Sequence, residues 1–332
     1  MAQYPITLSD SLETIAASLQ EVFHTRTRQD TMRHALTLLD AIARHADGDT
    51  VTVMTKNGAL DLYLPADPLL KLVRGNRRLR NRHAGERCFI VASGPSLKRI
   101  DLKALAGETV MTLSRGYSHP DFDAIAPRYH CITRIFREHM SDEKIREFFI
   151  DMDRRIGSAE LFLSTSEESI IRKNGIFFGR TVNYLHQLDD IPVPANGQMY
   201  DLCRSLPSVQ SVPVLALMIA IYMGFQDIYL LGVDHDEVWT RTYHYAHEPS
   251  FKFADPSVGE NGKVVTTTYD LLQNYAVLWR EYRRCRMMAE ENGCRIYNAS
   301  PGSALDEFER VDFGGLMLSP SSASSRGNPE AC

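Results

Sequence analysis

The chain has 332 residues, of which 44% are hydrophobic and 24% charged, so it is long enough for one large α/β domain with an appendage or for two smaller domains. This composition excludes a wholly disordered, collagen-like or disulfide-scaffold protein. A formal net charge of -5 argues against a nucleic acid as the main partner, because proteins that bind duplexes present a basic face.

The first 46 residues are predicted to be mainly helical, because their apolar residues recur at helical spacing. A β-hairpin is expected next, since residues 51–65 alternate in polarity on both sides of Asn57-Gly58. Residues 74–83 are rich in arginine. We interpret them as a solvated helix face that leads into the main domain, and the alternative is an element that contacts a phosphorylated substrate or acidic membrane lipids.

From Cys88 onward, short apolar runs alternate with helical stretches. Strands are predicted at 88–92, 109–113, 129–134, 160–164, 228–233 and 294–298, and helices at 142–155, 212–223 and 269–292. This alternation indicates βαβ units, so we expect an α/β protein with a Rossmann-like, mostly parallel sheet and helices on both faces. The expected domains are an N-terminal helical and hairpin region (1–80), the Rossmann-like domain (81–316) and a disordered tail (317–332) rich in Ser, Pro and Gly.

Location and redox state are also expectations from the sequence. The longest apolar run, residues 212–223, is too short to span a bilayer, and the N-terminus lacks the basic and apolar regions of a signal peptide. The six cysteines show no CxxC spacing, which favours reduced thiols. We therefore expect a cytoplasmic protein.

The first candidate site follows the strand at 88–92, because ligands of parallel sheets bind beyond the carboxyl ends of the strands. The turn Ser93-Gly94-Pro95-Ser96 is neither a Walker A loop nor a GxGxxG fingerprint. Gly94 allows the backbone to approach a ligand, and the two serines offer hydroxyl and N–H groups that can hold a phosphate. A plain strand-to-helix turn is the alternative.

The start of the apolar helix is the second candidate, where Gln210 and Ser211 precede residues 212–223. Ser211 is predicted to cap the helix, with Pro213 in its first turn. The free N–H groups and the positive end of the helix dipole suit a phosphate or a carboxylate. Capping without ligand binding is the alternative.

A cluster of titratable residues follows the strand at 228–233. Its members are Asp234, His235, Asp236, Glu237, His244 and His247. Imidazole is the natural general base near neutral pH, and a carboxylate can orient it. The alternative is a divalent-cation site at Asp234 and Asp236, whereas no spacing supports a closed zinc site. Asn298 and Ser300, in the loop after the last strand, can hydrogen-bond a base or a sugar.

Four segments together resemble the bacterial sialyltransferase-like proteins of glycosyltransferase family 42 and the related DUF115 proteins encoded with surface-polysaccharide genes. They are residues 85–102, 109–120, 210–236 and 294–308, which contain the GPSL turn and the apolar helix followed by IYLLGVD. The same superfamily includes enzymes similar to 6-hydroxymethylpterin diphosphokinase. The sequence departs from the family where Ser93 and Ser114 stand in place of asparagines, and where His235-Asp236 replaces a tyrosine.

The resemblance implies a nucleotide-binding domain that transfers a nonulosonic acid, sialic-acid-like or Kdo-like, from a CMP-activated donor with inversion and without an obligatory metal or other cofactor. It implies that the turn from Ser93 to Ser96 contacts CMP, that Ser211 meets the carboxylate or phosphate of the donor, and that a histidine is the base. His235, His244 and His247 are the candidates for that base, and His244 is our first choice because it is far enough along the chain to fold back over the donor.

The expected partners are this donor and a glycan or lipid-linked acceptor, in lipopolysaccharide or capsule biosynthesis at the cytoplasmic face of the inner membrane. Peripheral membrane contact and a homo-oligomer are both compatible with the sequence, and no nucleic-acid partner is expected. Two alternatives stay open. One is a Mg²⁺-dependent diphosphokinase of the pterin type, with Asp234 and Asp236 as metal ligands, and the other is an inactive sugar-nucleotide-binding protein.

Overall fold

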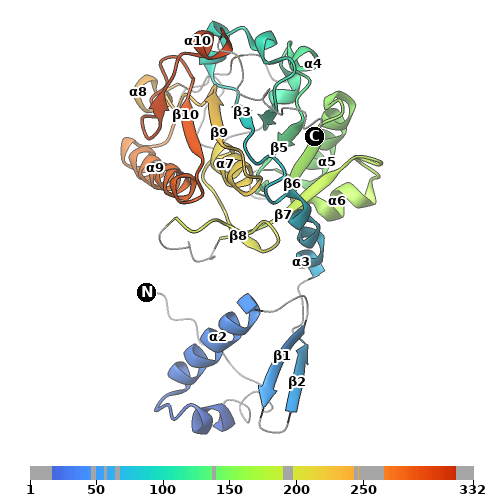
Figure 1. Ribbon diagram of the computed structural model, residues 1–332, viewed down its shortest axis with the longest axis vertical. Helices are drawn as coiled ribbons and strands as arrows, with labels where there is room; N and C mark the ends of the chain where they lie inside the picture. Colours follow the sequence, from blue (N-terminus) through green and yellow to red (C-terminus); the bar gives the residue numbers. More distant parts are fainter. Residues whose placement is uncertain are drawn as a thin grey trace, which may run out of the picture. The chain divides into compact units, whose positions relative to one another are not determined.

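The computed structural model describes residues 17–45, 50–55, 58–63, 68–136, 140–189, 197–242, 246 and 265–318. The chain divides into two compact units, Met1–Asp67 and Pro68–Cys332, which are described separately below (Figure 1). The division precedes residues 68–80, so these residues lie with the sheet of the second unit and not with the hairpin. The tail beyond residue 318 is outside the described residues.

The first unit combines helix and hairpin, as the sequence predicts. Residues 17–22 are helical, and they are followed by α2 (Arg28–His45), β1 (Thr50–Thr55) and β2 (Gly58–Tyr63). The two strands pair antiparallel, with Thr55 opposite Gly58. Gly58 is therefore the first residue of the second strand, whereas the Asn57-Gly58 pattern predicts that it belongs to the turn.

A nine-stranded sheet forms the centre of the second unit. Its strands are β3 (Arg87–Val91), β4 (Val110–Leu113), β5 (Tyr129–Cys131), β6 (Glu160–Ser164), β7 (Val182–Leu188), β8 (Ser205–Pro207), β9 (Asp227–Leu231), β10 (Arg295–Asn298) and β11 (Glu309–Arg310). They lie in the order β11-β10-β9-β3-β4-β5-β6-β7-β8, and each neighbouring pair is parallel. This confirms the predicted α/β class with a parallel sheet.

Helices cover both faces of this sheet (Figure 1). The α-helices are α3 (Pro68–Val73), α4 (Phe122–Ile125), α5 (Asp142–Arg155), α6 (Glu168–Lys173), α7 (Val212–Tyr222), α8 (Glu237–Thr240), α9 (Thr268–Glu291) and α10 (Phe313–Leu318). Successive residues of a strand point to opposite faces, so Cys88 and Ile90 of β3 enter one core with α7, whereas Phe89 and Val91 enter another. Burial on both faces explains why β3 reads as a continuous apolar run.

The helix α7 is almost completely buried. Every residue from Pro213 to Tyr222 is buried, because α9 packs on the side of α7 that faces away from the sheet. An apolar helix surrounded in this way has no polar face, which is why its sequence lacks helical amphipathicity. The helix begins at the carboxyl end of the sheet and so places its N-terminus beside the loops that follow β3 and β9.

Three strands were missed by the sequence interpretation, and β7 shows why. Asn183 and His186 are buried polar residues within it, so the strand lacks the continuous apolar run that marks its neighbours. Each finds a tertiary partner. Asn183 accepts a hydrogen bond from Arg78, and the Nδ1 atom of His186 lies 2.9 Å from the hydroxyl of Thr165. The other two strands, β8 and β11, have three and two residues.

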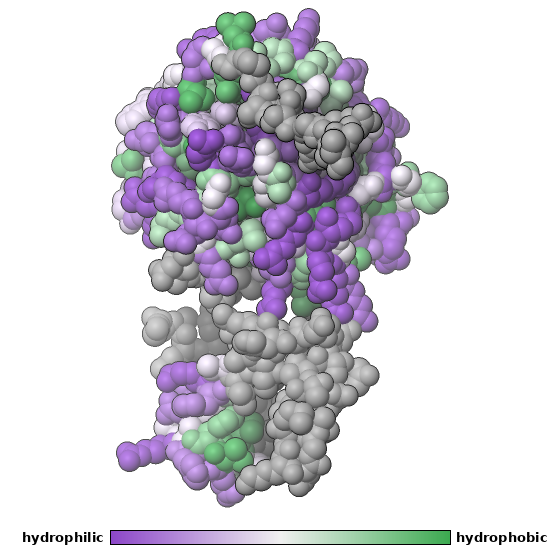
Figure 2. All heavy atoms as spheres, in the orientation of Figure 1, coloured by the Kyte–Doolittle hydropathy of each residue, from purple (hydrophilic) through white to green (hydrophobic). Residues whose placement is uncertain are grey.

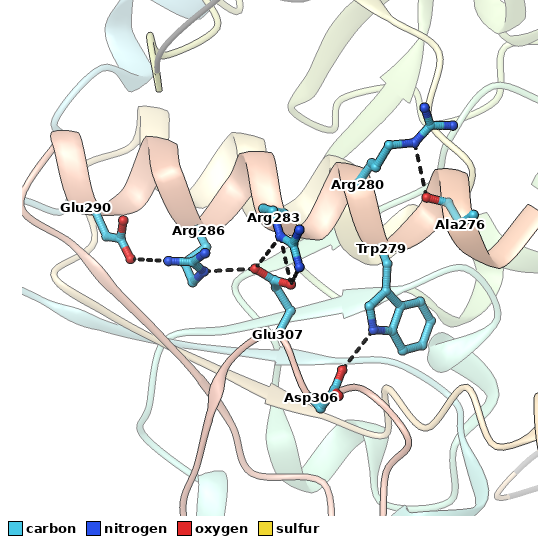
Figure 3. A network of polar contacts seen from close by, with 8 residues as sticks. All are labelled: Ala276, Trp279, Arg280, Arg283, Arg286, Glu290, Asp306 and Glu307. Atoms are coloured by element: carbon cyan, nitrogen blue, oxygen red, sulfur yellow. Dashed lines mark hydrogen bonds and ion pairs between the residues drawn. The ribbon is translucent and has the colours of Figure 1, made fainter.

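A polar network ties the segment after β10 to α9 (Figure 3). Glu307, whose side chain is 7% exposed, pairs with both Arg283 and Arg286 of α9. The indole N–H of Trp279 donates to Asp306 at 2.8 Å. These contacts hold α9 in register with the sheet, and they orient Trp279 and its aromatic neighbours toward the loop that follows β9.

The surface of the second unit has the character expected for the outside of an α/β protein. Hydrophilic residues predominate on the face seen in Figure 2, with hydrophobic residues scattered among them. Within the described part of the chain, no helix has both the length and the apolar character needed to cross a bilayer. The five described cysteines are free thiols.

Candidate functional site

The pocket lies where the strand order of the sheet changes direction. From β3 the chain continues through β4 to β8 on one side, whereas β9 lies on the other side of β3 and leads on to β10. The connections that follow β3 and β9 therefore run to opposite sides, and such a switch point leaves a crevice at the carboxyl ends of the strands. The pocket in this crevice is lined by residues 92–95, 113–115, 211–213 and 232–237.

Residues predicted from four distant segments meet in this pocket. Those that line it are Ser93, Gly94, Pro95, Ser114, Ser211, Asp234, His235 and Asp236. Ser96 lies directly behind the wall and is buried. His244 and His247 are outside the described residues, and Gln210, Asn298 and Ser300 lie away from the pocket wall.

Gly94 permits the closest approach between the two loops that form the pocket. Its N–H donates to the carbonyl of Gly232 at 2.9 Å. A Cβ atom at this position would lie 2.5 Å from both the Gly232 carbonyl oxygen and Oδ2 of Asp234. The backbone of Gly94 has an ordinary negative φ of -68°, so the requirement for glycine comes from space and not from conformation.

Asp234 joins the same two loops through its side chain. It is 6% exposed, and its Oδ2 accepts a hydrogen bond from the N–H of Ser96 at 2.7 Å. Burial raises the pKa of Asp234, although hydrogen bonding to Ser96 opposes this shift. The carboxyl group is thus part of the wall, and it holds the GPSL turn against the loop after β9.

The N-terminus of α7 is open to the pocket. Ser211 occupies the N-cap position with an extended backbone, but its side chain makes no capping hydrogen bond, contrary to the prediction. Behind it lies Tyr282, which is fully buried on α9 and whose pKa is raised by that burial. Ser211 and Val212 therefore present an uncapped helix end to the pocket, a favourable place for an anion.

Arg115 supplies a cation to this pocket and was missed by the sequence interpretation. It follows Ser114 at the end of β4 and lines the pocket while being only 9% exposed. Its position directly after a predicted strand was the available signal. Together with the end of α7, Arg115 makes one part of the pocket electropositive, and a guanidinium group binds phosphate or carboxylate oxygens well.

The turn that carries Ser114 and Arg115 is held by a neutral histidine. Ser114 has a positive φ of 50°, and its carbonyl lies 3.0 Å from Nε2 of His130. The other ring nitrogen of His130 lies 2.8 Å from the hydroxyl of Thr112. Complete burial lowers the pKa of His130 to about 3, so the ring is uncharged at neutral pH and holds the turn without adding charge to the pocket.

His235 is fixed by contacts on both sides of its ring. Its Nε2 lies 2.7 Å from the hydroxyl of Tyr282, and its Nδ1 lies 3.9 Å from Oε1 of Glu237. Tyr275 and Trp279 pack around the ring. Because Nε2 is engaged by Tyr282, aromatic rings enclose the side chain and the backbone adopts a positive φ of 52°, His235 is placed to hold the loop rather than to accept a proton from a substrate.

Glu237 forms part of the acidic wall of the pocket beside Asp236. Burial by itself favours the protonated form of Glu237, but the interactions of its carboxylate with His235 and Tyr275 outweigh burial and lower the pKa. Glu237 is therefore ionised at neutral pH. The pocket has an acidic wall at Asp236 and Glu237 and a basic wall at Arg115.

Asn298 and Ser300 support the loop after β9 from behind. The side-chain amide of Asn298 donates to the carbonyl of Leu305 at 2.8 Å, and the Ser300 hydroxyl accepts the N–H of Val233 at 3.2 Å. Both residues are almost completely buried. Their contacts are within the protein, on the side of the loop away from the pocket.

Gln210 binds a carboxylate at the approach to α7. Its N–H donates to Glu281 of α9, at 3.0 and 3.3 Å from the two carboxylate oxygens. Burial raises the pKa of Glu281 to about 7, against an ordinary value of 4.5, although the Gln210 N–H and Arg284 oppose this shift. Glu281 therefore titrates near neutral pH.

We expect the variant Glu281→Gln to be more stable than the wild type at pH 8. Because the pKa is higher in the folded state, ionising Glu281 opposes folding, so wild-type stability falls as the pH rises from about 4.5 to about 7. Glutamine keeps an acceptor for Gln210 and carries no charge. Allowing for partial solvent exposure, the gain at pH 8 is about 1 kcal/mol.

Thermal unfolding of both proteins from pH 4 to pH 8 measures this difference. The two melting curves should converge at the acidic end of the range. Glu290→Gln is the matched control on the same helix, because Glu290 is exposed and pairs only with Arg286 in the described structure. Equal stability of wild type and Glu281→Gln at pH 8 would contradict the assignment.

Metal ligation was an open alternative for Asp234 and Asp236. In the described part of the chain, no group of three or more His, Cys, Asp or Glu side chains is arranged to hold a metal ion. Asp234 and Asp236 both line the pocket, and Asp234 already accepts the Ser96 N–H.

Comparison with solved structures finds similarity to the sialyltransferase CstII. The complex of CstII from Campylobacter jejuni with cytidine-5′-monophosphate is 14% identical, with 69% of this chain and 85% of that chain covered and a TM-score of 0.38. A complex of CstII with a trisaccharide acceptor and CMP is 13% identical, covers 68% and 86%, and has a TM-score of 0.31. The chain is similar in fold to these sialyltransferases. No protein-family model and no curated protein matches the sequence.

Proposed function

We propose that the protein is a glycosyltransferase that takes a nonulosonic acid from a CMP-activated donor and transfers it with inversion to a surface-glycan or lipid-linked acceptor. The observation that carries this proposal is the pocket at the strand switch point, where Arg115 and the uncapped start of α7 face the GPSL turn. Such a pocket suits a ligand that carries both a phosphate and a nucleoside. The resemblance of the same segments to glycosyltransferase family 42 supports this assignment.

The leaving group is CMP, whose phosphate gains negative charge as the bond to the sugar breaks. Arg115 and the N–H groups at the start of α7 are arranged to stabilise that charge. Because a guanidinium group can neutralise the departing phosphate, the proposed reaction has no obligatory metal. Arg115 and α7 are themselves buried, so this electropositive wall is already in position before the donor binds.

The sugar becomes positively charged as the leaving group departs, in the manner of an oxocarbenium ion. Asp236 and Glu237 form the acidic wall of the pocket and suit that charge, since the lowered pKa keeps Glu237 ionised. The acceptor hydroxyl then needs a base on the opposite side of the sugar. His244 is our proposed base, because Nε2 of His235 is engaged by the hydroxyl of Tyr282.

A nucleotide screen by thermal shift tests the proposal. CMP and CDP, without Mg²⁺, should raise the melting temperature more than UDP, GDP or ATP do. A ligand at about 100 times its Kd adds about 2.7 kcal/mol to the stability of the native state. Arg115→Gln should lose most of the CMP effect, whereas Arg154→Gln, which removes an exposed arginine of α5, should keep it.

Other outcomes of this screen identify the alternatives. Stabilisation by ATP that requires Mg²⁺ contradicts the proposal and favours a diphosphokinase with Asp234 and Asp236 as metal ligands. Both aspartates line the pocket, which is the observation that favours this alternative. If CMP binds but a CMP-sugar is neither transferred nor hydrolysed, the protein is an inactive sugar-nucleotide-binding protein.

A further inference from the structure

The segment from residue 68 to residue 85, called the basic segment here, contains six cations and no acidic residue. The cations are Lys71, Arg74, Arg77, Arg78, Arg80 and Arg82. The chain as a whole has a formal net charge of -5, so this is a local concentration of positive charge in an acidic protein. The glycosyltransferase pocket uses none of these residues.

The local conformation turns the arginines outward. Residues 74–79 form a 3₁₀-helix, which repeats every three residues. Val73, Asn76 and Leu79 are accordingly buried, and the arginines between them are exposed. The amide of Asn76 donates to the backbone carbonyls of Tyr184 and Leu202 at 2.7 and 2.9 Å, which fixes the inner face of the helix.

The end of the basic segment is equally well anchored. The N–H groups of Asn81 and His83 donate to the carbonyls of Tyr222 and Met223, at the C-terminus of α7. Arg82 makes two hydrogen bonds to Glu160, at 2.7 and 2.9 Å. An array held in this way presents its charges without first having to be ordered, which reduces the entropy cost of binding.

The basic segment and the pocket lie at opposite ends of the strands of the sheet. The segment contacts Tyr129, Glu160 and Asn183, which stand at the start of β5, β6 and β7. The pocket lies at the carboxyl ends of the strands. In the region where Figure 1 places α3, the helix that begins the segment, hydrophilic residues predominate in Figure 2. A partner bound at this end of the strands leaves the pocket open.

We infer that the basic segment docks the protein on an anionic phospholipid surface. Exposed arginines bind lipid phosphates with paired N–H groups. Each cation near an anionic leaflet strengthens binding about fivefold. A membrane fits better than a nucleic acid, because proteins that bind duplexes are typically basic as a whole domain, whereas this chain has a formal net charge of -5. The inference concerns a different surface from the proposed reaction and does not depend on it.

Co-sedimentation of the full chain with vesicles tests this inference. The protein should bind vesicles of phosphatidylcholine with phosphatidylglycerol, should not bind phosphatidylcholine alone, and should be released by salt. The triple variant Arg74→Gln, Arg77→Gln, Arg80→Gln should bind about a hundredfold more weakly, given about fivefold for each cation. Arg78 and Arg82 are kept because they contact Glu160.

The matched control replaces three arginines elsewhere on the surface, with Arg146→Gln, Arg154→Gln and Arg280→Gln, and should bind like the wild type. If the triple variant does not fold, Arg80→Glu alone should still weaken vesicle binding about tenfold or more. Absence of wild-type binding to the anionic vesicles, equal binding by the variants, or equally tight binding to duplex DNA at the same salt overturns the inference. The CMP-induced thermal shift of the triple variant should match that of the wild type. This control distinguishes a loss of membrane binding from a loss of nucleotide binding.

Discussion

Replacing His244 by alanine should lower the rate of sugar transfer by about 10²–10⁴-fold and leave the CMP-induced thermal shift unchanged. A general base contributes about this factor to a proton-transfer step, and it acts on the acceptor rather than on the nucleotide. Steady-state transfer kinetics with a CMP-activated nonulosonic acid, alongside the thermal shift, measure both quantities. His244 lies outside the described residues, so the prediction rests on its place in the sequence and on the contact of His235 with Tyr282.

The comparison variant is His235→Ala, which should behave differently. Removing the ring leaves the buried hydroxyl of Tyr282 without its 2.7 Å partner, at a cost of about 1–3 kcal/mol. It also frees the loop that carries Asp236 and Glu237. We therefore expect His235→Ala to lose stability, nucleotide binding and transfer together. Near wild-type turnover of His244→Ala refutes its assignment as the base and transfers that role to His247 or Asp236.

The variant Gly94→Ala should lose CMP binding and unfold more easily than the wild type. Its new Cβ would lie 2.5 Å from the Gly232 carbonyl oxygen and from Oδ2 of Asp234, so the two loops must separate. Overpacking of this kind costs about 1–3 kcal/mol or more. Separation also breaks the hydrogen bond from the Ser96 N–H to Asp234, which shapes the pocket.

Gly75→Ala is the matched control for this substitution. No atom lies within 4 Å of a Cβ at Gly75, and its φ is not in the positive range. Alanine there should leave the stability unchanged or raise it slightly, because it restricts the unfolded chain. Thermal melting with and without CMP measures both variants. If Gly94→Ala keeps the full CMP shift, the close approach of the two loops is not needed for binding.

Local patterns in the sequence were sufficient for most of the framework. The run CFIVA predicted β3, and the apolar stretch at 212–223 predicted α7, because strands and helices buried on both sides must be apolar throughout. The turn after β3 was recognised as a candidate site from its glycine and its place at a strand end. The pocket lining then brought together Gly94, Ser211 and Asp234 from segments far apart in the sequence.

The sequence by itself therefore determined the α/β class, the parallel sheet and the end of the strands at which the pocket lies, since these follow from burial patterns within short segments. Only the tertiary structure decided the roles of individual polar side chains. Arg115 became a pocket residue through the placement of β4, and Ser211 makes no capping hydrogen bond to the helix that it was expected to cap. His235 is engaged by Tyr282, a residue 47 positions away. Such long-range pairings depend on how the helices and strands pack, so a local sequence pattern does not predict them.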